Sequence, residues 1–317
     1  MDSSHSSSDS GDVVVRLKDE RHIVIGHRLG TSDPLTDEPF DESQPPLPIS
    51  QDELTSVLVA NAPSERMVTL WLRDFDLRDI DLTSLSTWKN LSRLVFANCD
   101  IRKFDLGQLD SVLNSGGEFK LVIYGGLIDA RFVIPHINTI SSFLARNINA
   151  EILDLGPIGS QQFTFLQCND SSLQKIILPE APDCNLWSLD LRHNNLEEIN
   201  LENTVDWPVS VVVLDDNQLR SIDLSPLNGN VEYTDDLYLS LADNKLENID
   251  LSVLQGRKVA ELNFYGNPLK ELDVSHVTWG EIIEAFNVDP DVRVIGKPDW
   301  MLEHEMEERM WEEGNRE

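Results

Sequence analysis

Hydrophobic and polar residues alternate along this chain in a pattern that recurs at a nearly constant interval. The pattern is clearest over Leu186–Val274, where four copies of LxxLxLxxNxLxxIxL begin at residues 186, 209, 236 and 259. The xLxLx core of each copy predicts a short strand in which two apolar side chains face inward and their neighbours face outward. A single copy is too short to bury its apolar face, so the copies are expected to stack into one continuous core.

The repeat resembles that of the leucine-rich-repeat family, whose signature is LxxLxLxxN/CxL in units of about 20 to 29 residues. Two looser copies precede the clear block, at Met67–Leu82 and Leu91–Leu106. Between residues 107 and 185 the register is lost, although this length would hold about three irregular copies. The resemblance implies an intracellular-type α/β solenoid, a horseshoe with parallel strands on its concave face and helical caps at both ends.

The asparagine in each copy has a structural explanation. The chain turns inside the solenoid after each strand and leaves backbone groups that need hydrogen-bond partners. An asparagine side chain offers both an acceptor and a donor, so a buried column of asparagines can satisfy these groups. Cysteine also occurs at this position in the family, whereas Phe75 departs from the rule. The expected ladder is Cys99, Asn194, Asn217, Asn244 and Asn267.

A second column carries Asp or Asn between the last two apolar positions of each copy. An Asp that accepts a hydrogen bond from the backbone two residues later makes a local turn, so we interpret this column as a row of turns. The alternative interpretation is an acidic stripe that binds a basic partner. The column consists of Asp81, Asp105, Asn200, Asp223, Asp250 and Asp273.

The sequence divides into four regions. Residues 1–49 are acidic and rich in Ser and Pro, which predicts a mostly disordered region that can form a β-hairpin at 12–26. Residues 50–66 begin with the capping-box spacing of Ser50 and Glu53 and predict an N-terminal cap helix. Residues 67–278 form the solenoid, which is irregular at 107–185. Residues 279–317 form a C-terminal cap and an acidic helix.

Helical periodicity predicts how the C-terminal end is covered. A helix is expected over Ser275–Phe286, followed by a strand at Asp291–Gly296 and an acidic helix from Pro298 onward. Both helices are expected to pack over the open end of the solenoid. The apolar residues of these two helical faces are Trp279, Ile282, Ile283 and Phe286, then Leu302, Met306 and Met310.

Charge and cysteine content narrow the classes of function. The 317 residues carry a formal net charge of −31, and residues 186–274 hold 17 acidic against 6 basic residues, a balance of −11. Such a field repels nucleic-acid phosphates and anionic lipids and attracts basic partners. No apolar run is long enough to span a membrane or to serve as a secretory signal. The three cysteines lack any paired spacing, which favours a reducing compartment, the cytoplasm or the nucleus.

No catalytic or metal-binding pattern is present in the sequence. GxxxxGK[ST], GxSxG and HExxH are missing, and the seven histidines are scattered without metal-ligand spacing. We therefore expect neither an enzyme nor a bound cofactor. The outward strand positions remain, and the later ones combine carboxylates with tyrosines, which suits a partner bearing Lys or Arg. The candidate protein-binding residues are Trp71, Arg73, Asp190, Arg192, Asp215, Tyr238, Asp243, Glu261 and Tyr265.

These observations predict a non-enzymatic protein-binding scaffold or regulatory adaptor that uses the concave face. Two alternatives stay open, because a fold does not name its partner. One is an acidic binder of basic nuclear proteins such as histones, by resemblance to acidic nuclear leucine-rich-repeat proteins, although this chain lacks their long acidic tail. The other is a substrate receptor of a ubiquitin ligase, since LPISQDELTSVL (residues 47–58) is similar to the start of an F-box. The oligomeric state is not predicted.

Overall fold

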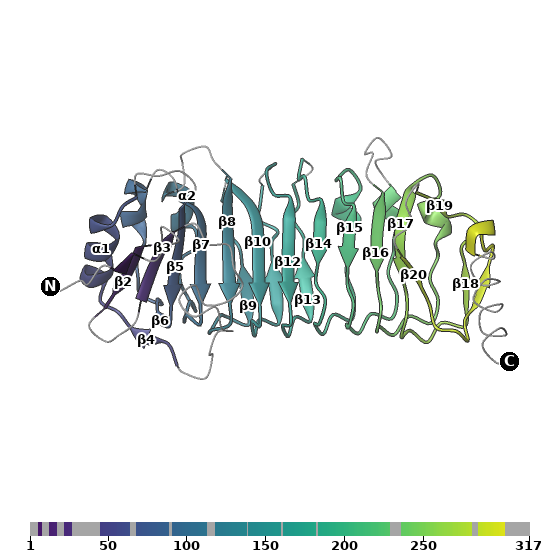
Figure 1. The fold of residues 1–317 in the computed structure, drawn as a ribbon, viewed down its shortest axis with the longest axis horizontal. Coiled ribbons are helices and arrows are strands. Elements are labelled where there is room, and N and C mark those ends of the chain that lie inside the picture. The colour runs from purple at the N-terminus through teal and green to yellow at the C-terminus, as the bar shows by residue number, and fades with distance from the viewer. Residues whose placement is uncertain are drawn as a thin grey trace.

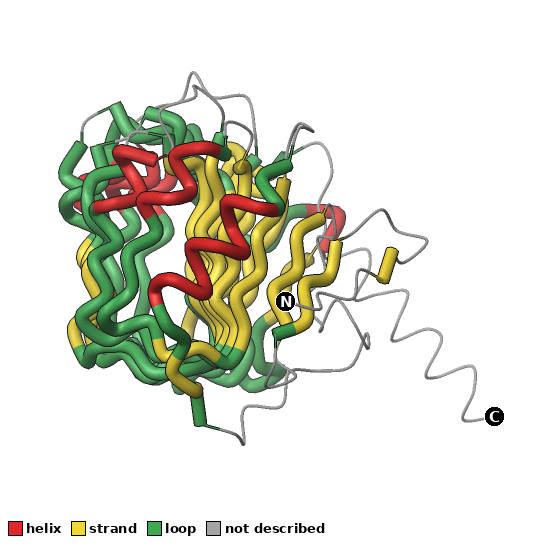
Figure 2. Tube along the Cα trace, turned by 90° about the vertical axis from the view of Figure 1, so that its left-hand side faces the viewer, coloured by secondary structure: helices red, strands yellow, loops and turns green. Residues whose placement is uncertain are grey.

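The chain folds into a solenoid of about nine turns, and the strands of successive turns lie side by side along its long axis (Figure 1). The computed structural model describes residues 6–7, 13–17, 22–26, 45–63, 68–88, 91–112, 118–137, 139–159, 161–181, 183–228, 236–280 and 285–301. Figure 2, which looks along the solenoid from its N-terminal end, shows these strands as one layer. Loops and short helical segments close each turn.

Among the described residues, one 14-stranded sheet forms this layer. Its strands follow one another in the order β1 (Ser6–Ser7), β2 (Val13–Arg16), β3 (His22–Gly26), β5 (Val68–Arg73), β7 (Leu91–Ala97), β8 (Phe119–Tyr124), β10 (Ile140–Arg146), β12 (Phe165–Asn169), β14 (Ser188–Asp190), β15 (Val211–Val213), β16 (Leu237–Ser240), β17 (Lys258–Asn263) and β19 (Thr278–Trp279). The remaining strand, β20 (Ala285–Asn287), also pairs with β17. The first strands pair antiparallel as far as β5, and the later pairs are parallel.

Within the described ranges, three shorter sheets and several helices complete the turns. A three-stranded parallel sheet contains β9 (Arg131–Val133), β11 (Ile152–Asp154) and β13 (Lys175–Ile177). The two-stranded sheets are β4 (Leu47–Pro48) with β6 (Phe75–Asp76), and β18 (Glu271–Asp273) with β21 (Arg293–Ile295). The α-helices are α1 (Gln51–Ala60) and α2 (Gln108–Val112), and the 3₁₀ helices are η1 (Thr83–Thr87), η2 (Glu202–Thr204), η3 (Ser225–Asn228) and η4 (Ser252–Leu254).

The region of lost sequence register, residues 107–185, contains three strands of the main sheet, β8, β10 and β12. This number matches the three irregular copies that its length would hold. Inward-facing residues of these strands, such as Leu121, Phe143 and Leu166, are fully buried. They join the single large core that runs through the solenoid, because alternate residues of a strand point to the same face.

The Asp and Asn column forms a row of turns, as the sequence predicts. Each side chain accepts a hydrogen bond from the backbone N–H two residues later, at 2.6 to 2.9 Å. These bonds fix the start of η1, η2, η3 and η4 and of the equivalent segments. In Asp223 and Asp273 the bonds from Ser225 and Ser275 hold the pKa of the carboxyl below its usual value.

The N-terminal end of the solenoid is covered by α1, which lies across it in Figure 2. Ser50 caps this helix, because its Oγ accepts a hydrogen bond from the Glu53 N–H at 3.2 Å. Leu54 and Leu58 point into the core, and the indole of Trp88 donates to the Leu58 carbonyl at 3.0 Å. Beside the helix, β2 and β3 form an antiparallel hairpin that extends the main sheet through β5.

The C-terminal end differs from the helix expected over Ser275–Phe286. Both ends of this segment are strands, β19 and β20, and they pair with β17. The reason is that the edge of β17 presents backbone groups that need partners, and strands satisfy them whereas a helix would not. Trp279 packs edge-on against Phe286 and Trp300, with ring centroids 5.9 and 5.5 Å apart. Ile282, Ile283 and residues 302–317, with Leu302, Met306 and Met310, lie outside the described residues.

Candidate protein-binding face

A column of asparagines, one after each of the strands β14 to β17, joins neighbouring turns of the solenoid. Asn244 shows the pattern, because its Oδ1 accepts a hydrogen bond from the Leu219 N–H at 3.0 Å. Its Nδ2 donates to the carbonyls of Leu214 and Leu241, at 2.9 and 3.1 Å. One buried side chain therefore satisfies backbone groups of two turns. Asn194, Asn217 and Asn267 repeat the arrangement, accepting at 3.0 to 3.1 Å from Leu173, Leu196 and Leu246.

Earlier turns fill the same position with other residues. The Cys99 thiol donates to the Leu72 carbonyl at 3.2 Å. Ser171 Oγ accepts from the Ile148 N–H at 3.1 Å and donates to the Asn169 carbonyl at 2.8 Å. The stacked turns, the repeat spacing and this ladder define the fold. The protein is a leucine-rich-repeat solenoid.

A second column of this leucine-rich-repeat protein lies one residue before the ladder. In each of nine turns this residue has a left-handed backbone, with φ between 48° and 76°. Only Gly, and less readily Asn, Asp or His, adopts this conformation at low cost, which explains the residue types found there. The column therefore places mainly polar residues along the edge of the outer face, which is the face of the main sheet that points away from the core. Its members are Asp74, Asn98, Gly125, Asn147, Asp170, His193, Asp216, Asp243 and Gly266.

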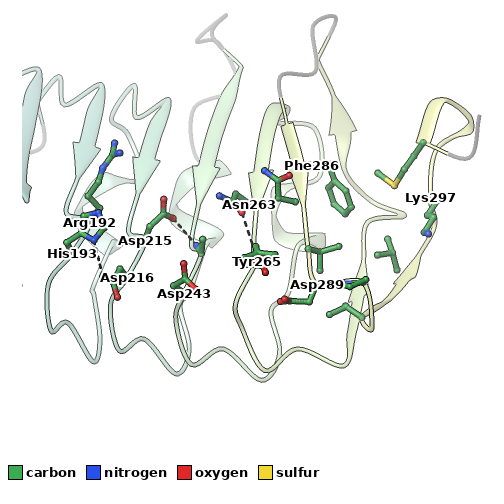
Figure 3. A pocket seen from close by; sticks show the side chains of 17 residues that line it. Arg192, His193, Asp215, Asp216, Asp243, Asn263, Tyr265, Phe286, Asp289 and Lys297 are labelled. Atoms are coloured by element: carbon green, nitrogen blue, oxygen red, sulfur yellow. Dashed lines mark hydrogen bonds and ion pairs between the residues drawn. The ribbon is translucent and has the colours of Figure 1, made fainter. Parts of the chain in front are cut away.

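Carboxylates gather where this column meets β15, β16 and β17. Asp215 Oδ1 accepts from Ser240 Oγ at 2.6 Å and from the Ala242 N–H at 2.8 Å, so its position is fixed. Asp216 Oδ2 lies 2.9 Å from His193 Nδ1. The exposed Asp243 carboxylate has no hydrogen-bond or ion-pair partner within the described part of the chain. Figure 3 shows these side chains on successive turns.

These carboxylates border a hollow of about 920 Å³, which we call the acidic hollow. Its far wall comes from the C-terminal segment, where Asp289 Oδ2 accepts from the Gly266 N–H at 2.8 Å. Tyr265 stands in the hollow with 54% of its surface exposed. The walls of this hollow thus combine negative charge with aromatic and apolar surface. The residues used below are Asp215, Asp216, Asp243, Tyr265, Phe286 and Asp289.

The structure brings together part of the predicted binding set. Arg192, Asp215, Asp243 and Tyr265 line the acidic hollow. Tyr238 and Glu261 are paired in register on neighbouring strands of the same face, outside the hollow lining. They are half-buried rather than fully exposed.

Two predicted residues are placed differently from the expectation. Trp71 is 3% exposed instead of being a surface aromatic, because it packs with Val24 of the hairpin, with Val95 and with Val122. Asp190 is 7% exposed, and its carboxylate is bound by Arg192 at 2.8 Å and by Asn169 Nδ2 at 3.2 Å. The carboxylate of Asp190 is therefore neutralised within the protein, which raises the pKa of the Arg192 guanidinium.

Arg73 lies on β5, far along the sheet from the acidic hollow. Its Nε is 3.0 Å from Asp74 Oδ2. The binding set predicted from the sequence is thus divided between two distant parts of the face.

Several residues of the acidic hollow were not in the predicted set. His193 and Asp216 belong to the left-handed column, whose signal in the sequence is the residue just before each ladder asparagine. Phe286, Asp289, Lys297 and Met301 come from the C-terminal region, for which the sequence predicts a helix up to Phe286, a strand over Asp291–Gly296 and a helix from Pro298. Phe286 lies instead in β20, which pairs with β17, and helical periodicity does not show that this end of the chain borders the hollow.

The described residues contain no cluster of three or more His, Cys, Asp or Glu side chains arranged to hold a metal ion. Among the same residues, no helix is both long and apolar enough to cross a membrane.

No family model matches the chain, and no curated protein matches it. Solved structures resemble it in fold. The functional domain of InlJ from Listeria monocytogenes, which includes a cysteine ladder, aligns with a TM-score of 0.44 and 18% identity over 71% of this chain. The alignment covers only 44% of that chain, so this protein spans less than half of the InlJ structure.

Two further structures align over a similar share of the chain. The leucine-rich repeat domain of APL1B gives a TM-score of 0.44 and 15% identity, over 72% of this chain and 73% of that one. The leucine-rich-repeat protein LIC12759 of Leptospira interrogans gives 0.37 and 14%, over 76% and 66%.

Proposed function

We propose that this protein is a non-enzymatic scaffold or adaptor that binds a basic segment of a partner protein in the acidic hollow. Leucine-rich-repeat folds commonly serve as protein-interaction scaffolds. The partner segment carries Lys or Arg, because the hollow offers several carboxylates beside an exposed aromatic ring. The three buried, free cysteines are consistent with a location in the cytoplasm or the nucleus.

The observation that carries this proposal is the pair formed by Asp243 and Tyr265. The Asp243 carboxylate is exposed and without a partner among the described residues, and its own N–H is bonded to the Tyr265 carbonyl at 2.7 Å. A Lys or Arg side chain entering the hollow meets this charge and the tyrosine ring together. Asp216 and Asp289, on the turns to either side, add to the negative field.

The test uses short synthetic peptides that contain Lys and Arg, compared with peptides of equal apolar content that contain Asp and Glu. Binding is measured by fluorescence anisotropy at increasing salt concentration. We expect only the basic peptides to bind, and we expect their affinity to fall as salt rises from about 0.05 to 0.5 M. Binding of acidic and basic peptides with equal affinity would contradict the proposal.

Asn is the suitable replacement at the left-handed positions, because it tolerates that backbone and removes the charge. The double variant Asp216→Asn with Asp243→Asn is expected to weaken binding of the basic peptides several-fold. The matched control is Asp223→Asn with Asp250→Asn, which removes the same charge from the turn column, where Asn200 already occurs. Equal loss in both pairs would show a general charge effect instead of a site.

Affinity capture with mass spectrometry then separates the classes of partner. Recovery of one basic cellular protein supports the scaffold, and recovery of histones supports the nuclear alternative. Recovery of core ligase subunits supports a substrate receptor.

A further inference from the structure

A second hollow, of about 380 Å³, lies on the same face beside the acidic hollow. We call it the neutral hollow. It is formed at the carboxyl ends of β8, β10, β12 and β14. Arg192 and His193 line both hollows, so the two adjoin each other along the face. The argument below uses Tyr124, Leu144, Arg146, Asn169 and Asp170 from its lining.

Asn169 gives this hollow a buried acceptor that has no hydrogen-bond partner among the described residues. Its side chain is 7% exposed, and its Oδ1 has no hydrogen bond within the described part of the chain. The Nδ2 donates to Asp190 Oδ2, which Arg192 holds in place, so the amide orientation is fixed. An unsatisfied buried carbonyl is costly, and a donor supplied by a ligand would remove that cost.

The charges around Asn169 are already paired. Arg146 Nε lies 2.8 Å from Asp170 Oδ2, and Arg192 Nη2 lies 2.8 Å from Asp190 Oδ2. The hollow is therefore close to neutral, unlike its acidic neighbour. It does not attract a charged side chain by its field.

Its other wall is apolar. Four apolar residues are paired in register on the neighbouring strands β5, β7, β8 and β10, so they form an apolar row along the outer face. They are Trp71, Val95, Val122 and Leu144. The first three are buried, and the row ends at the half-buried Leu144. Tyr124 stacks on Trp71, with ring centroids 6.3 Å apart, and forms the adjacent surface. The end of the apolar row is thus accessible at the neutral hollow.

We propose that the neutral hollow receives an apolar or aromatic side chain of an extended partner segment, while a backbone N–H of that segment donates to Asn169 Oδ1. This inference rests on the proposed function, because the same segment places its Lys or Arg in the acidic hollow. The neutral hollow is then a second position at which the partner's sequence is recognised. Together, the two hollows define the direction in which the bound segment runs across the turns.

Geometry fixes the spacing between the two anchors. Leu144 lies on β10, and Asp243 follows β16, four strand positions away along β10, β12, β14, β15 and β16. At about 4.8 Å per strand spacing this is about 19 Å. An extended peptide rises about 3.3 Å per residue, so about six residues separate the two anchors.

The experiment uses synthetic peptides with a fixed pair of lysines and one tryptophan in a Gly/Ser background. The tryptophan is placed about two to ten residues from the lysines, on either side of them. We expect the affinity, measured by fluorescence anisotropy, to peak near a separation of six residues in one chain direction. The gain over the same peptide without tryptophan is expected to be about fivefold or more.

Two variants and one modified peptide test the residue assignment. Leu144→Ala should reduce the gain from tryptophan, and Asn169→Ala should weaken the best peptide roughly threefold to tenfold. N-methylation of the peptide amide that faces Asn169 should weaken binding to the wild type but not to Asn169→Ala. Asn203→Ala, in η2 on another side of the turn, is the control and should change nothing.

The outcomes separate this inference from the proposed function. If lysine peptides bind but tryptophan adds nothing at any separation, the neutral hollow is not a recognition site and the acidic hollow stands. Equal loss on N-methylation in the wild type and in Asn169→Ala would also overturn the hydrogen bond proposed here. If no basic peptide binds even at low salt, the proposed function itself fails.

Discussion

The side-chain oxygen of Asn217 accepts a hydrogen bond from the backbone N–H of Leu196, which lies on the preceding turn, at 3.0 Å. The Nδ2 of the same asparagine donates to the carbonyls of Leu191 and Leu214, both at 3.0 Å. Asn217 is 2% exposed, so no water can replace it without rearrangement. One side chain thus joins the backbones of two turns.

Replacing this asparagine should destabilise the solenoid. Asn217→Ala leaves buried backbone groups without partners, and the free energy of unfolding is expected to fall by about 1–3 kcal/mol. Urea unfolding followed by circular dichroism measures the change. The control is Asn195→Ala, since Asn195 is exposed and keeps its backbone bond to Leu173. Equal stability of the two variants would mean that the ladder does not hold the turns together.

The clear block of repeats could be predicted from sequence because spacing and ladder residue agree in every copy. Between residues 107 and 185 the ladder position is filled by Gly126, Ile148 and Ser171, which carry no family signal. The strands there still form, because their alternating apolar residues are buried in the common core. Periodicity alone could not locate their turns.

Two errors have physical causes that the sequence does not display. The spacing of Trp279 and Phe286 suits a helix face, but both residues lie in strands that pair with the open edge of β17. Trp71 was expected on the surface because alternation points it outward. Alternation does not reveal that Val14 and Val24 of a distant hairpin pack on the same face.

The pairing of Asp100 should make stability depend on pH. Burial raises the pKa of Asp100, but the hydrogen bonds from Arg102 and the charges of Arg102 and Arg78 lower it by more. The pKa of Asp100 is therefore below its usual value. Arg102 Nη2 lies 2.7 Å from Asp100 Oδ2, and Arg78 Nε lies 3.3 Å from it. A depressed pKa stabilises the fold above the unfolded-state pKa of about 3.9, and this contribution is lost as pH falls through the folded-state value.

Removing Arg102 tests this dependence. The Arg102→Ala variant should be less stable than wild type, with the largest difference above about pH 5 and a narrowing gap below about pH 4. Unfolding in urea at several pH values measures the gap. Arg220→Ala, which removes an exposed cation, should give a small difference that does not vary in this way. A gap that widens at low pH would contradict the assignment.

The three thiols should be unreactive while the protein is folded. Burial raises the pKa of Cys168 to about 12 and that of Cys184 to about 11, so little thiolate exists at pH 8. Cys99 is buried as well and donates to a carbonyl. Alkylation followed by mass spectrometry should show slow labelling of all three in buffer and rapid labelling in guanidinium. An engineered Gln174→Cys at an exposed position gives the reference rate, and equally fast labelling of Cys99 would show that its turn is misplaced.

Gly266 and Asp243 should be energetically coupled. A Cβ at Gly266 would lie 2.2 Å from Asp243 Oδ1, and the glycine has a φ of 76°. Gly266→Ala is expected to destabilise the fold by about 1 kcal/mol or more, through clash and backbone strain. In an Asp243→Gly background the clash with the carboxylate is gone, so the same substitution should cost less. Additive effects in urea unfolding of the double variant would contradict this coupling.

Tyr265 should carry much of the affinity for a basic segment. Tyr265 is 54% exposed and lies beside Asp243, so a bound Lys or Arg can contact the ring face and the carboxylate at once. Cation–π contacts contribute about 0.5–2 kcal/mol, which predicts a loss of roughly twofold to thirtyfold for Tyr265→Ala with a basic peptide. Such an exposed side chain adds little to stability, so unfolding of this variant should match that of the wild type.

The nature of the replacement decides whether the ring is responsible. Tyr265→Phe keeps the ring and should retain most of the affinity, whereas Tyr265→Leu keeps apolar surface but should bind weakly. Trp187→Ala removes another exposed aromatic, at a position that does not line the acidic hollow, and should bind like wild type. The ring contact adds to the charge attraction, so salt should weaken Tyr265→Ala and wild type to the same degree. If Tyr265→Leu binds as well as Tyr265→Phe, the tyrosine acts through apolar area alone and the cation–π contact is wrong.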